Sequence, residues 1–201
     1  MYALVIDGAV AKYPYTIGNL RRDNPNTSFP KRPSDEMLAE WGMQPVTKEE
    51  KPAVSDGQVA VQDATPTLVN DVWVLGWTVR AMTAEELAED TKRKKADIKA
   101  RRDQAINSGT TVNGVTVATD DLSQQRITGA ALAATVDNTT TVKWKLPDDT
   151  FVTLDATQII GIAQGVRAHV QACFDREADL LAALEAGQSY DIDAGWPAKP
   201  E

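Results

Sequence analysis

Cysteine and histidine are almost absent from this chain of 201 residues, which contains one of each. The single cysteine, Cys173, cannot form an intrachain disulfide, and the apolar helical pattern around it predicts a small core residue. His169 lies on an amphipathic helix, which favours a structural histidine over a metal ligand or a member of a Ser-His-Asp triad. Phosphate-binding glycine loops and the HExxH zinc motif are also missing. The sequence therefore predicts no catalytic, cofactor-binding or metal-binding residue, and no enzyme.

Adjacent carboxylates offer the one remaining route to catalysis. Two carboxyl groups several ångströms apart can cleave a glycosidic bond, and the chain contains the pairs Asp120-Asp121 and Asp148-Asp149. Each pair occupies a position that a helix cap or a turn explains fully. Nothing in the sequence selects a catalytic pair, so we interpret all four residues as structural.

Long apolar runs are lacking as well, and none approaches the roughly 20 residues that a membrane-spanning helix needs. The opening segment YALVIDG has the alternation of a short strand and not the features of a signal peptide. The formal net charge of -8 disfavours nucleic acid and anionic membranes as partners, and the one basic run, Lys92 to Arg102, is spread around a helix. We expect a protein made in a cytosol that stays there or enters a particle assembled there.

The longest turn-free segment, Thr83 to Gly109, predicts a charged helix between two strand-rich blocks. Thr83 and Glu86 have the spacing of a capping box, and Gly109 suits the left-handed conformation just past a helix end. Only half of a heptad seam laid on this segment is apolar, which disfavours a long coiled coil. We interpret residues 83–109 as a mostly solvated connector helix, with a short oligomeric stalk as the alternative. It would rest on a neighbour through a narrow stripe of Leu87, Ile98 and Ile106.

Residues 1–82 predict a strand-rich N-terminal docking domain. Asp7-Gly8 favours a type I′ turn, so we expect a hairpin of residues 2–6 and 9–13. Residues 71–80 have the pattern of a single long strand. Its predicted core face comprises Trp73, Leu75, Trp77 and Val79. The alternative interpretation is that the two tryptophans form a ligand platform.

The segments between these strands are rich in turn signals. Residues 15–33 predict an ordered loop, because their prolines disfavour helix in the preceding residues. Ser34 can cap a short helix that Gly42 ends. Residues 44–52, QPVTKEEKP, predict a polar turn before another extended segment at 58–65.

Tyrosine and arginine gather around the predicted loop, where Tyr13, Tyr15, Arg21 and Arg22 form an aromatic and basic cluster. Protein interfaces are enriched in these residue types. The cluster is our candidate partner-contact surface, and an ordinary exposed loop is the alternative interpretation.

Residues 110–187 predict a small C-terminal α+β domain. Asn113-Gly114 favours a hairpin turn, and a further hairpin flanks PDD at residues 147–149. Asp121 and Gln124 have the spacing of a cap for a helix that runs to about Thr135.

A second, longer helix completes that domain. Asp155 and Gln158 repeat the capping pattern, and an apolar stripe at helical spacing, which includes Cys173 and Phe174, continues until Gly187. The two helices can sandwich the small hairpins. Residues 188–201 predict an irregular tail, with Trp196 either anchored or exposed. The expected fold class for the whole chain is α+β.

Several patterns together resemble a small domain of unknown function that recurs in tail fibre and tail-associated proteins of tailed bacteriophages. The similar region runs from Arg102 to about Leu181. It contains a helix that ends in INSG, the NG hairpin, a D-x-x-S-Q-x-R-I-x-G helix start, a tryptophan strand with its D-x-F-V-x-L partner, and an H-V-x-A-x-F-x-x-E helix. Upstream, WGMQPV and VWVLGWTVRAMTAEE resemble the N-terminal parts of phage tail proteins that carry the same domain.

The resemblance implies a non-enzymatic structural or adaptor component of a phage tail or baseplate, assembled in the host cytoplasm and located in the virion. Its partners would be other tail, baseplate or fibre proteins, and a homotrimer is one arrangement that fibre proteins suggest. Two alternatives stay open: a tail fibre assembly chaperone absent from the mature virion, and a receptor module that binds host-surface polysaccharide.

Overall fold

The computed structural model describes residues 1–146 and 149–200, and these contain five helices and several small sheets. The predicted α+β class is confirmed. The chain divides into two compact units, Met1–Leu87 and Ala88–Glu201. The division falls inside helix α3 (Ala84–Ile106), whereas the sequence predicts boundaries after residues 82 and 109.

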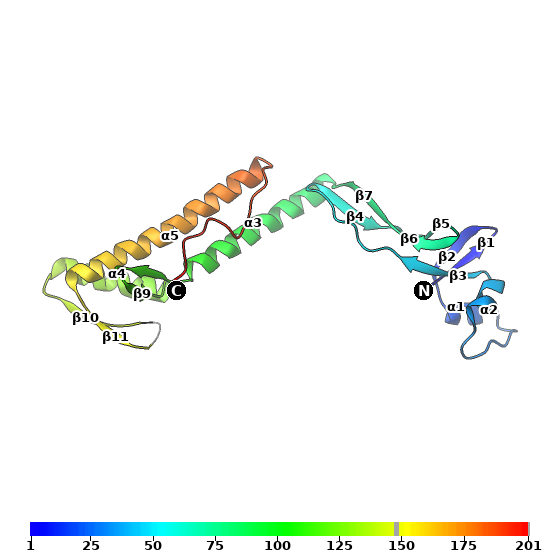
Figure 1. The fold of residues 1–201 in the computed structure, drawn as a ribbon, viewed down its shortest axis with the longest axis horizontal. Helices are drawn as coiled ribbons and strands as arrows, with labels where there is room; N and C mark the ends of the chain where they lie inside the picture. The colour runs from blue at the N-terminus through cyan, green and yellow to red at the C-terminus, as the bar shows by residue number, and fades with distance from the viewer. Residues whose placement is uncertain (147–148, 201) are drawn as a thin grey trace. The chain divides into compact units, whose positions relative to one another are not determined.

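Strands dominate the first unit. Its elements are β1 (Tyr2–Ile6), β2 (Ala9–Tyr15), α1 (Ile17–Asp23), α2 (Asp35–Glu40), β3 (Met43–Lys48), β4 (Gln58–Gln62), β5 (Thr67–Val69), β6 (Val72–Leu75) and β7 (Trp77–Ala81). Five strands form a sheet in the order β2-β1-β3-β6-β5, in which only β3 and β6 run parallel (Figure 1). β4 and β7 form a separate antiparallel ladder.

Two local signals of the first unit are confirmed. Asp7 and Gly8 both have positive φ, 50° and 77°, as the turn between β1 and β2 requires. Ser34 caps α2 by accepting a hydrogen bond from the Met37 amide, and Gly42 follows that helix at a φ of 75°.

Two buried clusters hold this unit together, and each uses strand residues. One comprises Tyr15, Leu20, Leu38 and Met43, and the other comprises Ala3, Val46 and Leu75. The predicted core face of residues 71–80 is therefore confirmed for Leu75, which is 2% exposed, and in part for Trp73, which packs against the second cluster. Trp73 and Trp77 are half-buried, and Val79 is exposed.

Three predictions for the first unit are wrong. Residues 15–33 are not all loop, because Thr16 and Asn19 form a capping box that starts α1. Residues 44–52 are not all turn, because β3 pairs with β1 on one side and β6 on the other. The strand expected over 71–80 is interrupted at Gly76, so that β6 and β7 join different sheets.

Helix α3 begins as the sequence predicts. The Glu86 amide donates to the Thr83 hydroxyl at 3.2 Å, and the Thr83 amide donates to the Glu86 carboxylate at 2.8 Å. Arg80 forms an ion pair with the same carboxylate at 2.7 Å, and Arg80 first, then the Thr83 amide, lower the pKa of Glu86 to about 2. Gly109 follows the helix with a φ of 83°. Of the predicted stripe, Ile98 and Ile106 are buried, whereas Leu87 is 43% exposed.

The second unit packs small hairpins against helices. Beyond the α3 residues from Ala88 onward, its elements are β8 (Thr110–Val112), β9 (Val115–Val117), α4 (Asp121–Val136), β10 (Thr141–Lys145), β11 (Phe151–Asp155) and α5 (Ala156–Glu185). Both predicted hairpins form as antiparallel pairs, β8 with β9 and β10 with β11. The turn residues Pro147 and Asp148 lie outside the described residues.

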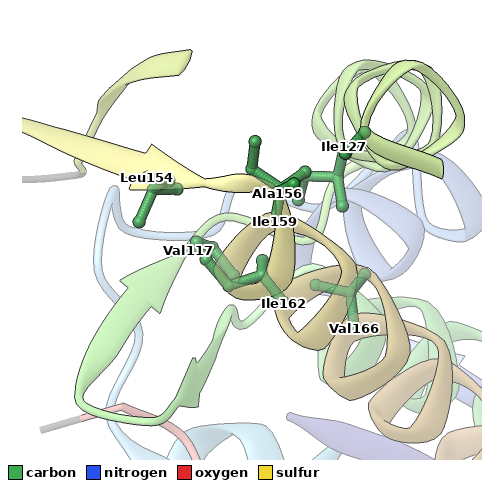
Figure 2. Packing of buried hydrophobic residues seen from close by; sticks show 8 residues of the cluster. Val117, Ile127, Leu154, Ala156, Ile159, Ile162 and Val166 are labelled. Carbon is green, nitrogen blue, oxygen red and sulfur yellow. The ribbon is translucent and has the colours of Figure 1, made fainter. Parts of the chain in front are cut away.

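The core of the second unit lies where α4 and the hairpins meet the first half of α5. Figure 2 shows side chains from β9, α4 and β11 directed toward the buried face of α5. Its buried members are Val117, Ile127, Ala134, Leu154, Ala156, Ile159, Ile162 and Val166. Further along α5, Cys173 packs on Ala105 and Ile106 of α3, which confirms it as a core residue.

Two cap predictions have different outcomes. Asp155 and Gln158 form the predicted capping box of α5. The cap of α4 is Asp120 and not Asp121, because the Asp120 carboxylate accepts hydrogen bonds from the amides of Leu122 and Ser123.

The C-terminal tail has no helix or strand among residues 188–200, and it is anchored. The Trp196 indole donates to the Ile192 carbonyl at 2.7 Å and packs beside Cys173. Arg176 of α5 donates to the Ala194 carbonyl at 2.9 Å, which ties the tail to that helix.

Candidate protein-interaction site

The four residues of the predicted contact surface are split between core and surface. Tyr15 is 2% exposed and belongs to the apolar cluster of the first unit, so its side chain offers almost no surface to a partner. Tyr13 is half-buried against the other cluster, and its hydroxyl lies 2.9 Å from the Met1 sulfur. The register of β2 against β1 shifts between the pairs Tyr2–Tyr15 and Leu4–Lys12, which breaks the alternation of β2, so Tyr13 and Tyr15 pack in different clusters.

The arginines stay on the surface. Arg21 and Arg22 occupy the last turn of α1, where a cation is favoured by the helix dipole, and both are exposed. Arg21 donates to the Pro30 carbonyl at 2.7 Å and so fixes the loop that follows the helix. Of the predicted surface, Arg22 is the residue whose guanidinium is most accessible to a partner.

A charged network supports this end of the first unit. Asp23 accepts from Lys12 at 2.8 Å and from the Tyr15 hydroxyl at 3.0 Å. Lys12 first, and then Tyr15, lower the pKa of the Asp23 carboxyl. Burial, followed by the hydrogen bond to Asp23, raises the pKa of Tyr15 to about 12. These contacts order the β2–α1 junction. They also give the hydroxyl of the buried Tyr15 a hydrogen-bond partner.

The second unit exposes a row of apolar residues that the sequence patterns did not single out as a surface. Ile127 and Ala134 are buried on the inner side of α4, but its opposite side also carries large apolar side chains, and these face solvent. This α4 outer row has a spacing of three and four residues and comprises Leu122, Gln125, Gly129, Leu132 and Val136. Leu132 is 67% exposed and Val136 is 83% exposed. Exposed apolar side chains that are grouped on one face of a helix are a feature of protein-interaction surfaces.

A groove runs between α4 and α5 on another side of α4. It encloses about 490 Å³, and its apolar lining includes Ala131, Ile160, Ala163 and Phe174. Phe174 is 44% exposed although it belongs to the predicted apolar stripe of α5.

The groove residue Phe174 is held in place by a charged side chain of α3. The Arg102 guanidinium stacks 4.8 Å from the Phe174 ring centroid, and it forms an ion pair with Glu177 at 2.6 Å. The two charged side chains are only 13% and 14% exposed. A nearly buried ion pair of this kind fixes the position of α3 on α5 and with it the position of the ring.

The single histidine and the single cysteine both lie in the interior of the second unit. His169 is buried and hydrogen-bonded, since its Nε2 lies 3.0 Å from the Ala105 carbonyl. Burial raises the pKa of the Cys173 thiol, which disfavours a reactive thiolate. Within residues 1–146 and 149–200, no three histidine, cysteine or acidic side chains are grouped as metal ligands. In that same part of the chain, no helix has the combined length and apolarity that crossing a bilayer requires.

Comparison with known proteins gives a family and no named relative. Neither the curated proteins nor the solved structures include a significant match to this chain. One family model matches residues 89–195, which is a little more than half of the sequence and covers most of α3, all of α4 and α5, and the hairpins between them. The chain therefore belongs to the family described as a domain of unknown function, DUF4376.

Proposed function

We propose that this protein is a non-enzymatic structural or adaptor component of a bacteriophage tail that joins tail proteins through protein–protein contacts. The resemblance of residues 102–181 to a domain of phage tail fibre proteins supports this origin. The main structural support for a role in protein–protein contacts is the α4 outer row. Its exposed leucine and valine side chains form an apolar surface of the kind that binds another protein.

An adaptor needs two contact surfaces, and each unit offers one. In the first unit the exposed guanidinium of Arg22, beside Arg21, provides a basic face suited to an acidic surface of a tail or fibre protein. In the second unit the α4 outer row suits an apolar surface. The two faces differ in chemistry, so they favour two different partners.

Mass spectrometry of purified intact particles tests the proposal. A tail component is detected at a fixed few copies per particle relative to the major tail protein. Reproducible absence from particles, with the protein abundant in infected lysate, would refute the virion role and support the assembly chaperone instead.

Substitution then tests which surface is used. Leu132→Glu places a charge in the α4 outer row and should abolish incorporation into particles or reduce it severely, because a charge is poorly tolerated in an apolar contact. Thr153→Glu is the matched control, since it adds the same charge at an exposed position of β11 in the same unit. Equal incorporation of both variants would exclude the α4 outer row as the contact.

A further inference from the structure

The solvent side of α5 is unusual for an exposed helix face because it carries few charges. Ion pairs and core contacts hold its other sides against α3, α4 and the C-terminal tail. The outward side is exposed along nearly the whole helix, and only Ile160 is half-buried. This α5 outer face comprises Ile160, Gln164, Arg167, Ala168, Gln171, Phe174, Asp175, Ala178 and Ala182.

These residues are arranged symmetrically about Gln171. Arg167 lies four positions before it and Asp175 four positions after it, so the two ends of the face carry opposite charges. In an antiparallel pair of identical helices centred on Gln171, each residue faces the one at the same distance on the other side of the centre. We propose that α5 pairs antiparallel with α5 of a second copy of this chain, across a twofold axis at Gln171.

The charges select a second copy as the occupant. Arg167 has no ion-pair partner among the described residues, and Asp175 accepts a hydrogen bond only from Gln171, at 2.8 Å. Eight residues of helix separate Arg167 from Asp175 by about 12 Å, so they cannot pair within one chain. In the antiparallel pair, each Arg167 faces Asp175 of the second copy, and the twofold axis produces this contact twice.

Side-chain sizes are complementary in the same register. Phe174 faces Ala168 of the other copy, and Ile160 faces Ala182. Gln164 faces Ala178, so each of these three large side chains meets an alanine. Alanine at these positions allows two helix axes to approach to about 8 Å, the short end of the usual range. The second helix would also cover the exposed ring of Phe174 and the α5 wall of the groove.

This pairing goes beyond the proposed function and does not depend on a phage origin. It leaves the α4 outer row open to another protein. A dimer formed through α5 would present that row twice, related by the same axis.

A charge swap on the full-length chain provides the test. Arg167→Glu and Asp175→Lys each bring like charges together at two places, so each should raise the dimer dissociation constant about tenfold or more in sedimentation equilibrium. The double variant R167E/D175K recreates both pairs with reversed sign and should restore the wild-type constant. Glutamate and lysine are good helix formers, and circular dichroism checks that each variant keeps its helix content.

The two single variants also separate pairing from a general effect of net charge. R167E makes the acidic chain more negative and D175K makes it less so. A net-charge effect therefore moves their dissociation constants in opposite directions, whereas pairing raises both.

Three results would overturn the proposal. The first is a wild-type chain that is monomeric at high micromolar concentration, and the second is a trimer. The third is a dimer whose dissociation constant in the double variant does not return to the wild-type value. Lys143→Glu is the control for added negative charge, because Lys143 is exposed on β10 and has no ion pair within the described residues.

Discussion

Two glycines of α5, one helical turn apart, should respond oppositely to the same substitution. A methyl group added at Gly161 has no neighbour closer than the Asn113 side-chain nitrogen at 3.7 Å, which is an ordinary contact. At Gly165 the same methyl group would lie 2.3 Å from one γ-carbon of Val112 and 2.9 Å from the other. Turning the valine side chain cannot relieve this, because its β-carbon would be 3.2 Å away.

The magnitudes follow from two opposing effects. Replacing glycine by alanine in a helix interior stabilises by about 1 kcal/mol at either position. Overpacking against β8 costs about 1–3 kcal/mol, and only Gly165→Ala incurs that cost. Gly161→Ala should therefore stabilise the second unit by about 1 kcal/mol, and Gly165→Ala should leave it unchanged or destabilise it by up to about 2 kcal/mol. The difference between the variants, about 1–3 kcal/mol, is the cleaner quantity because the helix effect cancels.

Hydrogen exchange of α5 amides measures this difference, since it reports opening of the second unit separately from the first. Val112→Ala removes both γ-carbons, so combining it with Gly165→Ala should recover about 1–2 kcal/mol relative to the sum of the single effects. If Gly165→Ala stabilised α5 as much as Gly161→Ala, the β8–β9 hairpin would not be packed on α5, and the description of the core would be wrong.

Three further outcomes test other contacts. The Glu86 carboxyl has a folded pKa of about 2, below its usual 4.5, so its stabilisation of the α3 start is complete above pH 4.5 and lost as the pH falls toward 2. The protection factor of the Glu86 amide, which compares its exchange rate with the intrinsic rate at each pH, should fall in that window. The buried Cys173 thiol should resist Ellman's reagent in the folded protein and react fully in denaturant. Arg102→Ala should destabilise the second unit by about 3 kcal/mol and Glu177→Ala by about 1 kcal/mol in the same exchange measurement, because Arg102 keeps its second partner, Asp103, when Glu177 is removed.

Elements whose signals lie within a few neighbouring residues could be predicted from the sequence. The two hairpin turns at Asp7-Gly8 and Asn113-Gly114 require positive φ, and these residue types tolerate it. The capping box at Thr83 and Glu86 likewise involves only groups three residues apart. In each case the residues that carry the signal also make the stabilising contact, so no knowledge of the tertiary structure is needed.

Predictions failed where a tertiary contact outweighed the local preference. β3 contains Pro45 and reads as a turn, yet its two neighbours, β1 and β6, supply hydrogen bonds along both edges. α1 is only seven residues long, and its formation depends on Leu20, which is buried in the core cluster of the first unit. Tyr15 belongs to that cluster as well. Burial in this cluster is therefore the reason why residues 15–33 are not all loop and why Tyr15 is not part of a contact surface.

Apolar periodicity along α5 illustrates a limit of a different kind. The pattern groups Cys173 and Phe174 into one stripe, although their positions differ by 100° around the helix axis. The structure places Cys173 in the core beneath α3 and leaves Phe174 44% exposed. A helix of 30 residues that contacts two other helices needs apolar residues in more than one direction. Once α3 and α4 have taken their contacts, the remaining apolar residues of α5 face solvent, and their symmetry about Gln171 is the basis for the proposed pairing with a second copy.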